Sequence, residues 1–211
     1  VVVGLDQRSR FPQAEENWQA WVDIRHTGLS DNRNGIDASG HANNVLVGVH
    51  RAFGSDLVAG LAAATSKARF GAFDSAVRND ADGVFAGPYA GYRLSANWLL
   101  DGWAAWGRTD NDTQLAVLRG DFRTTTWFAS ANLTGGYGFG DYLFRPKLAL
   151  FYSHNTSDAF DYTGTLPYAG QIYNLTLRVA ENSFDYATSE LSGDISRVFT
   201  TAGGTRVIPA L

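Results

Sequence analysis

The side chains able to do chemistry are few in this sequence, and they do not gather in a recognisable motif. Its 211 residues include four histidines and no cysteine, so a disulfide framework, a thiolate metal site and a cysteine nucleophile are excluded. His50 falls on the polar side of a predicted strand, whereas His26, His41 and His154 fall in predicted polar loops. No histidine has the spacing of a zinc motif. We therefore expect solvated loop histidines and a pore-lining His50 rather than metal ligands.

One segment could carry a nucleophile beside a base. Ser153 and His154 are adjacent, and Asp158 and Asp161 follow within the same predicted rim. A nucleophile needs a base within hydrogen-bond reach, which adjacency in sequence does not supply. We therefore interpret these side chains as polar residues of the rim without a catalytic role. We expect no catalytic residue and no enzyme activity.

Two acidic stretches resemble calcium loops only faintly. They are Asp110-Asn-Asp112 and Asn79-Asp-Ala-Asp82. Neither continues into the twelve-residue pattern that ends in a bidentate glutamate. Solvated acidic loop tips explain them better, so no metal and no cofactor is predicted.

The composition indicates a surface that does not all face water. Charged residues make up 18% of the chain and aromatic residues 13%, whereas a soluble domain carries about 25% charged residues. The net charge of −4 argues against a nucleic-acid partner, because phosphate neutralisation needs a basic surface. No apolar run reaches the roughly 18 residues of a membrane-spanning helix. Strands could still cross a membrane, since their alternating pattern is averaged away in hydropathy.

The elements that position these side chains have a period of two. In residues 142–152 one side is wholly apolar, with a tyrosine at each end, and the other side carries Arg145 and Lys147. Residues 124–137 and 97–108 follow the same scheme, and similar runs occur at 18–25, 44–50, 84–94 and 187–199. Residues 57–66 are apolar on both sides, which leaves their orientation open. Ten strand residues tilted by about 40° rise roughly 25 Å, the height of the apolar band of an outer-membrane barrel.

The connections are predicted to alternate in length. Short turns fall at 53–56, 93–97, 138–141 and 200–205, and long polar loops at about 26–42, 67–81, 108–121 and 155–184. Short turns on one rim and long loops on the other are typical of a transmembrane barrel. The predicted fold is therefore all-β, an antiparallel up-and-down transmembrane β-barrel with eight strands and the start of a ninth at 206–209.

The alternation assigns two sets of residues to the two sides of the wall. The expected lumen-facing polar residues are Asp23, Arg25, His50, Arg93, Asp101, Arg145, Lys147, Glu190 and Asp194. The expected aromatic girdle residues are Trp98, Trp106, Trp127, Tyr137, Tyr142 and Tyr152. A lumen of mixed charge would stay hydrated and could pass a polar chain, while the same charges could equally stiffen the wall by pairing.

Three short patterns, in this order and spacing, resemble the translocator barrel of autotransporters. They are Val47-Gly-Val-His-Arg-Ala-Phe-Gly54, Gly87-Pro-Tyr-Ala-Gly-Tyr92 and Trp98-Leu-Leu-Asp-Gly-Trp-Ala-Ala-Trp-Gly107, and Phe144-Arg-Pro-Lys-Leu-Ala-Leu-Phe-Tyr152 also fits. The resemblance implies a barrel of about twelve strands in a Gram-negative outer membrane, which anchors an N-terminal passenger and helps to export it. Implied partners are outer-membrane lipid, the passenger and the barrel-assembly machinery.

The resemblance also implies a division of the chain. Residues 1–16 would be the remnant of a linker or pore segment, and residues 17–211 a barrel that lacks its C-terminal strands. Two other functions stay open. One is a porin-like or structural outer-membrane barrel without a passenger, and the other is a soluble ligand-binding barrel with its apolar face turned inward.

Overall fold

The computed structural model describes residues 18–31, 37–197, 199–200 and 206–207. All regular elements of this part are strands: β1 Trp18–Asp31, β2 Ala38–Phe53, β3 Leu57–Ala72, β4 Val77–Arg93, β5 Trp98–Leu115, β6 Leu118–Gly135, β7 Tyr137–Phe139, β8 Tyr142–Ser157, β9 Phe160–Tyr168, β10 Gln171–Val179, β11 Asn182–Arg197, β12 Phe199–Thr200 and β13 Arg206–Val207. No helix in it is long and apolar enough to cross a membrane.

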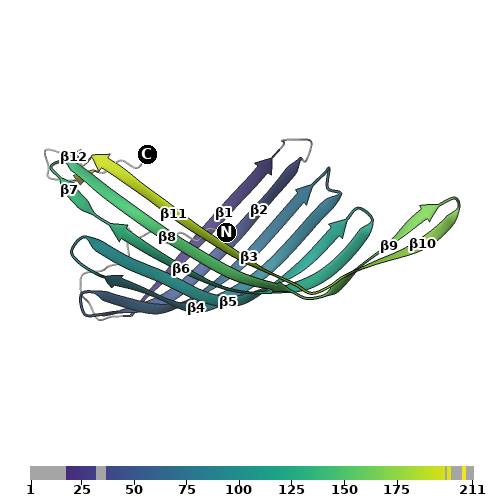
Figure 1. The fold of residues 1–211 in the computed structure, drawn as a ribbon, viewed down its shortest axis with the longest axis horizontal. Helices are drawn as coiled ribbons and strands as arrows, with labels where there is room; N and C mark the ends of the chain where they lie inside the picture. The colour runs from purple at the N-terminus through teal and green to yellow at the C-terminus, as the bar shows by residue number, and fades with distance from the viewer. Residues whose placement is uncertain (1–17, 32–36, 198, 201–205, 208–211) are drawn as a thin grey trace.

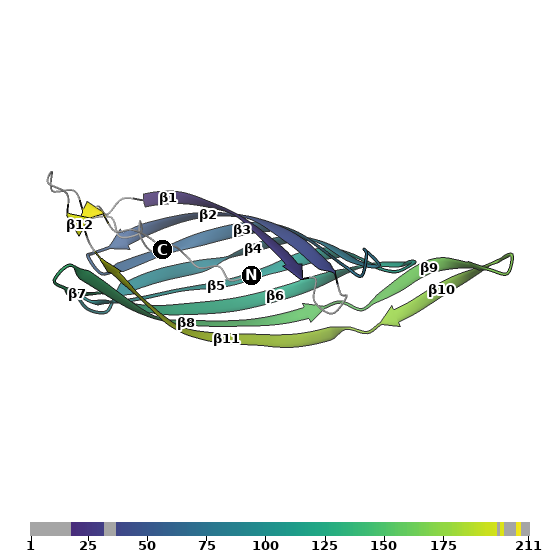
Figure 2. The same ribbon diagram turned by 90° about the horizontal axis from the view of Figure 1, so that it is seen from above.

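Eleven of the strands form one curved antiparallel sheet, whose main path is β1-β2-β3-β4-β5-β6-β8-β11, and β12 pairs with β13 in a separate two-stranded sheet. Nearly every strand pairs with its neighbour in sequence, as in an up-and-down meander. The exception is the β9–β10 hairpin, which is inserted between β8 and β11 and projects beyond the sheet (Figures 1 and 2). The sheet is open within the described residues, with β1 and β11 at its edges. The predicted all-β antiparallel barrel architecture is confirmed as a partial barrel wall of eight long strands.

The sheet has two chemically distinct faces, which the register defines. Residues paired across strands lie on the same face, and successive residues alternate between faces. We call the face that carries the buried cluster of Leu46, Tyr89 and Trp103 the inner face, and the opposite one the outer face. Trp21 of β1 reaches Tyr89 of β4 on the inner face, across two intervening strands. Side chains converge in this way on the concave side of a curved sheet, so the inner face is the concave one.

The register also settles the orientation of residues 57–66. Leu61 pairs with Val49 and Pro88 on the outer face, whereas Ala62 pairs with Gly48 on the inner face. The sequence pattern left this strand open because both of its faces are apolar.

The long polar loops predicted from the sequence are wrong for most of their length. Residues 67–72 belong to β3 and 77–81 to β4, joined by the short turn at 73–76. The predicted loop at 108–121 is strand except for the turn at 116–117, and that at 155–184 contains β9 and β10. Beyond the bilayer both faces of a strand meet water. The apolar alternation therefore stops there, whereas the backbone pairing continues. The sequence pattern shows where the alternation ends but not where the pairing ends.

Two consequences follow for residues placed in those loops. His26, His41 and His154 lie in β1, β2 and β8, not in loops. The acidic stretches at 79–82 and 110–112 are strand residues of β4 and β5, not loop tips. The four short turns fare better, since turns lie at 54–56, 94–97 and 140–141; residues 201–205 lie outside the described residues.

Candidate functional site: the two faces of the wall

The outer face carries an exposed band of aliphatic side chains. On the first two strands Val22 is 63% exposed, Ile24 74% and Val47 48%. On β8, Leu148 is 38% and Leu150 47% exposed. Ala129 and Leu133 share this face, because they pair with Tyr152 and Leu148. An apolar surface that runs continuously across eight strands is far larger than a monomer normally presents to water, and it fits contact with hydrocarbon.

All six predicted girdle residues lie on the outer face. Trp106 pairs with Trp127 in neighbouring strands, and the Trp127 ring lies 5.0 Å from that of Tyr152. Nearer the short turns, the Trp98 ring lies 6.0 Å from Tyr137, and Tyr142 follows on β8. Aromatic rings gather at the two water interfaces of membrane barrels. This arrangement supports the girdle assignment, which stays a prediction for the membrane-embedded protein.

A belt of polar residues follows the band at the end of the sheet that carries the turns 73–76 and 116–117 and the β9–β10 hairpin. Its ion pairs include Lys67 with Asp82 at 3.2 Å and Arg123 with Asp110 at 2.9 Å. Farther out, in the part of β4 beyond the apolar band, a hydrogen bond from Arg78 lowers the pKa of Asp80, and Arg69 adds to the effect. Charges packed this densely belong in water, so the belt marks the end of the hydrocarbon layer.

The boundary between band and belt steps across the sheet. Ile24 and Val45, its partner on β2, are still apolar, but the same row of paired residues contains Arg108 at β5. At β8 the row below it already contains His154, the partner of Trp127. Rows of paired residues run perpendicular to the strands. The surface of a membrane is flat, so a band boundary that crosses these rows means that the strands are tilted against the membrane normal. Tilts of about 35–45° are characteristic of transmembrane barrels.

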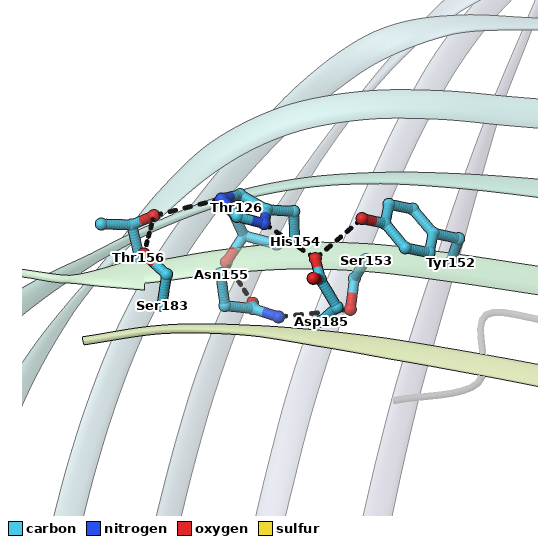
Figure 3. Close-up of polar contacts among 8 residues, drawn as sticks. All are labelled: Thr126, Tyr152, Ser153, His154, Asn155, Thr156, Ser183 and Asp185. Carbon is cyan, nitrogen blue, oxygen red and sulfur yellow. Dashed lines mark hydrogen bonds and ion pairs between the residues drawn. The ribbon is translucent and has the colours of Figure 1, made fainter.

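A polar cluster on the outer face holds β8 against β11 (Figure 3). One carboxylate oxygen of Asp185 accepts a hydrogen bond from Tyr152 Oη at 2.7 Å and lies 2.8 Å from His154 Nδ1. Ser153 belongs to the inner face, as the partner of Phe128, and its hydroxyl accepts from Asn155 Nδ2 at 3.3 Å. The adjacent Ser153 and His154 therefore project to opposite faces, and the structure does not bring them together as a nucleophile and a base.

The two aspartates grouped with this pair from the sequence are also not gathered at it. Asp158 follows the end of β8, and its backbone N–H donates to Arg123 O at 2.9 Å. Asp161 lies in β9, where it pairs with Arg178. The acidic partner of His154 is Asp185, which lies 31 positions away in the sequence. Only the β8–β11 register could have identified it.

The register places all nine predicted lumen residues on the inner face. Several pair with each other or with neutral groups. Arg25 and Asp23 form an ion pair at 2.9 Å, Arg145 and Asp194 another at 2.8 Å, and Asn132 Nδ2 donates to Asp101 at 2.9 Å. The other four have these register partners. Arg93 lies opposite Leu99, and Lys147 lies opposite Thr134 and Ser192. Glu190 lies opposite Ala149, and His50 lies opposite Gln19 and Gly60. That this face borders a water-filled lumen stays a prediction.

The middle of the inner face is aromatic rather than polar, which the sequence analysis missed. Trp103 is 4% and Tyr89 8% exposed, and the Phe128 ring meets Trp103 edge to face at 4.9 Å. Phe85 and Phe151 extend the cluster on either side of Phe128. In the sequence, Trp103 falls on the same side of its strand as Asp101. This alternation is the signal from which an inward-facing aromatic residue could have been predicted.

A chain of hydrogen bonds fixes one end of this cluster. Trp21 Nε1 donates to Tyr89 Oη at 2.6 Å, and His50 Nδ1 lies 2.6 Å from the same oxygen. Gln19 Oε1, 3.2 Å from His50 Nε2, can only accept, so Nε2 carries the proton. A neutral ring with this tautomer accepts at Nδ1 from the Tyr89 hydroxyl. At this end of the cluster the polar atoms of Trp21, Tyr89 and His50 thus have partners, whereas Trp103 Nε1 is buried without a hydrogen-bond partner among the described residues.

Gly48 on β2 makes room for the Trp21 ring, and Gly60 on β3 allows a close approach to the backbone of β2. A Cβ atom at Gly48 would lie 2.5 Å from the Trp21 indole, and one at Gly60 would lie 2.2 Å from the backbone oxygen of Val49. Any side chain at Gly48 would displace the tryptophan that reaches across the sheet. The small residues of β2 and β3 and the rings of β1, β4 and β5 therefore form one packing unit.

A tilted antiparallel sheet with an apolar outer face that carries aromatic rings, and an inner face with charges of both signs, is typical of the wall of an outer-membrane β-barrel. The family model for the autotransporter β-domain matches residues 20–211. The chain belongs to this family, which locates it in the outer membrane of a Gram-negative bacterium.

Solved structures show the same fold. The translocator domain of the autotransporter NalP from Neisseria meningitidis aligns with a TM-score of 0.70 and 12% identity, over 89% of this chain and 64% of that one. The β-domain of the Bordetella autotransporter BrkA aligns with a TM-score of 0.57 and 15% identity, over 85% of each chain. This chain thus spans about two thirds of the NalP domain. A search of curated proteins found no match.

Proposed function

We propose that this domain is the translocator of a longer protein, which it anchors in the outer membrane while it helps an N-terminal passenger reach the cell surface. The segregation of the two faces carries the proposal. The outer face offers hydrocarbon an aliphatic band, and the inner face carries paired charges around a packed aromatic cluster. Membership of the autotransporter family supplies the class of cargo, a passenger polypeptide.

The mechanism is physical. Hydrogen bonds between neighbouring strands satisfy the backbone, which hydrocarbon would otherwise leave unpaired at a cost of several kcal/mol per group. The inner ion pairs, such as Arg145 with Asp194, are already satisfied, so they can line a path without gripping the chain that moves along it. No bond-making step is assigned to any residue, and we propose that the domain is not an enzyme.

Closure of the wall and its assembly belong to the same proposal. Strands outside residues 18–197 would pair with the edges of β1 and β11 and complete a barrel of about twelve strands. Residues 1–16, which lie outside the described residues, would form the linker toward the passenger. Outer-membrane lipid and the barrel-assembly machinery are the proposed partners.

The test is passenger display by the full-length protein in a Gram-negative host. External protease is added to intact cells, and the barrel is followed in parallel by its heat-dependent gel mobility. We expect a folded barrel together with an upstream segment that external protease digests. Leu150→Arg is the matched control, since a charge in the hydrocarbon band should prevent insertion and protect the passenger.

Two results would contradict the proposal. A folded barrel whose upstream segment stays in the periplasm would exclude a translocator. Steady conductance of small solutes by a barrel that displays no upstream segment would favour the porin-like alternative.

A further inference from the structure

The outer face is hollowed where small side chains on β3 and β4 lie between larger ones. In one row of paired residues, Ala63 and Ala86 lie between Val47 of β2 and Trp106 of β5. Val47 is 48% and Trp106 61% exposed, so both rise above the two alanines. A hollow of about 480 Å³ over this row continues into a second of about 890 Å³, since Val47, Ala63 and Ala86 line both. We call the two hollows together the β3–β4 groove.

Arg108 lines the end of this groove that borders the polar belt. Its side chain is exposed. The two carboxylates of the next outer-face row, Asp82 and Asp110, are already held by other cations, Asp82 by Lys67 at 3.2 Å and Asp110 by Arg123 at 2.9 Å. Among the described residues no carboxylate pairs with Arg108. The apolar groove therefore ends at a guanidinium whose charge is not balanced.

A third hollow on the outer face shows that this combination is particular to the β3–β4 groove. It lies over β6, β8 and β11, has a similar volume of about 510 Å³, and is lined by no cation within the described part of the chain. At its polar end Tyr152 and His154 both contact Asp185, so the polar groups there satisfy one another. Any acyl chain fits an apolar hollow, whereas a free guanidinium beside it selects a lipid with an anionic headgroup.

We propose that the β3–β4 groove and Arg108 together bind lipid A, the phosphorylated and multiply acylated glycolipid of the outer leaflet. The short turns of outer-membrane barrels face the periplasm, so Arg108, at the opposite end of the band, lies at the level of the outer leaflet's headgroups. Acyl chains fill the groove between Val47 and Trp106. A phosphate group accepts two hydrogen bonds from the guanidinium, a geometry that arginine favours. The proposal uses the location of the barrel and is independent of passenger export.

The surroundings of Arg108 fit a sugar phosphate better than the phosphate of a phospholipid. The ion pairs of Lys67 with Asp82 and of Arg123 with Asp110 lie directly beyond it, and all four side chains are largely exposed. Their cations donate hydrogen bonds and their carboxylates accept them, as the hydroxyl groups of a sugar require. A phospholipid headgroup has few hydroxyl groups and would leave most of these side chains to water.

The direct test is a lipid titration of the full-length barrel in detergent, followed by native mass spectrometry. The probes are lipid A with both phosphates, the same lipid A after removal of the phosphates, and phosphatidylglycerol. We expect the phosphorylated lipid A to bind about tenfold more tightly than the dephosphorylated form, which is the effect of hydrogen bonds to one charged group. Equal affinity for the two forms of lipid A, or for phosphatidylglycerol, would overturn the proposal. A protein dimer that lipid A does not displace would also overturn it, because a second copy would then occupy the groove.

Two pairs of variants locate the site. Arg108→Gln removes the guanidinium, and Arg119→Gln, the matched control, removes an exposed outer-face guanidinium opposite Gln114, away from the groove. Ala63→Leu fills the β3–β4 groove with an apolar side chain that hydrocarbon tolerates, and Ala131→Leu fills the hollow over β6 and β8. We expect Arg108→Gln and Ala63→Leu each to weaken the binding of phosphorylated lipid A severalfold, and both controls to bind like the unaltered barrel. Arg108→Gln should also lose the preference for the phosphorylated form.

Heat-dependent gel mobility shows that each variant is folded before it is titrated. Unchanged binding by folded Arg108→Gln, or an equal loss in Arg119→Gln, would refute the site, since the charge at the groove would then have no special role. The comparison of the two forms of lipid A on the unaltered barrel needs no variant, so it decides the question even if a substitution prevents folding.

Discussion

The outer and inner faces of the same strands are built under different constraints. On the outer face, side chains such as Val22 and Leu150 are exposed and need only be apolar, because lipid adapts to their shape. On the inner face, Trp21 of β1 must fit Tyr89 and Trp103, which pair directly on β4 and β5, and Gly48 beneath its own ring. The outer face is thus specified by composition and the inner face by shape, and substitutions on the two faces should fail for different reasons.

The largest expected difference concerns two tryptophans three positions apart. Trp103 is 4% exposed on the inner face, whereas Trp106 is 61% exposed on the outer face. Trp103→Ala should lower the free energy of unfolding by about 3–5 kcal/mol, because it leaves a cavity among Tyr89 and Phe128. Trp106→Ala should cost clearly less. Urea unfolding of the full-length protein in lipid vesicles measures both, and equal losses would refute the packed inner cluster.

Adjacent positions on β8 test the lipid-facing band itself. Leu150→Arg places a cation on the outer face, at an expected cost of about 2–4 kcal/mol near the bilayer midplane. Ala149→Arg places it on the inner face opposite Glu190, where a counter-charge is at hand. The fraction of protein that reaches the heat-modifiable folded form gives the comparison. A greater loss for Ala149→Arg would reverse the assignment of the faces.

The hydrogen-bond chain on the inner face should produce an intermediate effect. Tyr89→Phe keeps the ring but removes the hydroxyl that bridges Trp21 and His50. Leaving buried polar groups without this partner should cost about 1–3 kcal/mol. Tyr92→Phe on the outer face of the same strand is the control and should be close to neutral. Vesicle unfolding again provides the measurement, and a neutral Tyr89→Phe would show that the chain adds nothing to stability.

The smallest effect is expected from the ion pair between Arg145 and Asp194. The side chain of Asp194 is 54% exposed, so solvent screens the pair and its contribution should be about 0–1 kcal/mol. A double-mutant cycle with Arg145→Gln and Asp194→Asn isolates the coupling, which should shrink further in high salt. A salt-insensitive coupling of several kcal/mol would mean that this part of the inner face is dry.

The sequence predicts the membrane-embedded half of the strands well, because hydrocarbon forces an alternation that can be read directly. The face of Leu148 and Leu150, and the inner position of Arg145, follow from that alternation alone. The projecting strand ends were predicted as loops because water on both sides removes the pattern. The inner cluster was missed because Trp21 and Tyr89 are brought together by sheet curvature and by Gly48 and Gly60, which no local pattern encodes. The same holds for Asp185 beside His154, a partnership set by register.

The chain's lack of cysteine allows the central claim to be tested with little background. A single cysteine is introduced at each of the positions 147 to 152 in turn and labelled with a fluorophore. Each labelled barrel is then inserted into vesicles that contain a lipid-embedded quencher. The account predicts strong quenching at 148, 150 and 152 and weak quenching at 147, 149 and 151, with the opposite order for a water-soluble quencher. Strong lipid quenching at 147, 149 and 151, or uniform quenching along the strand, would contradict it.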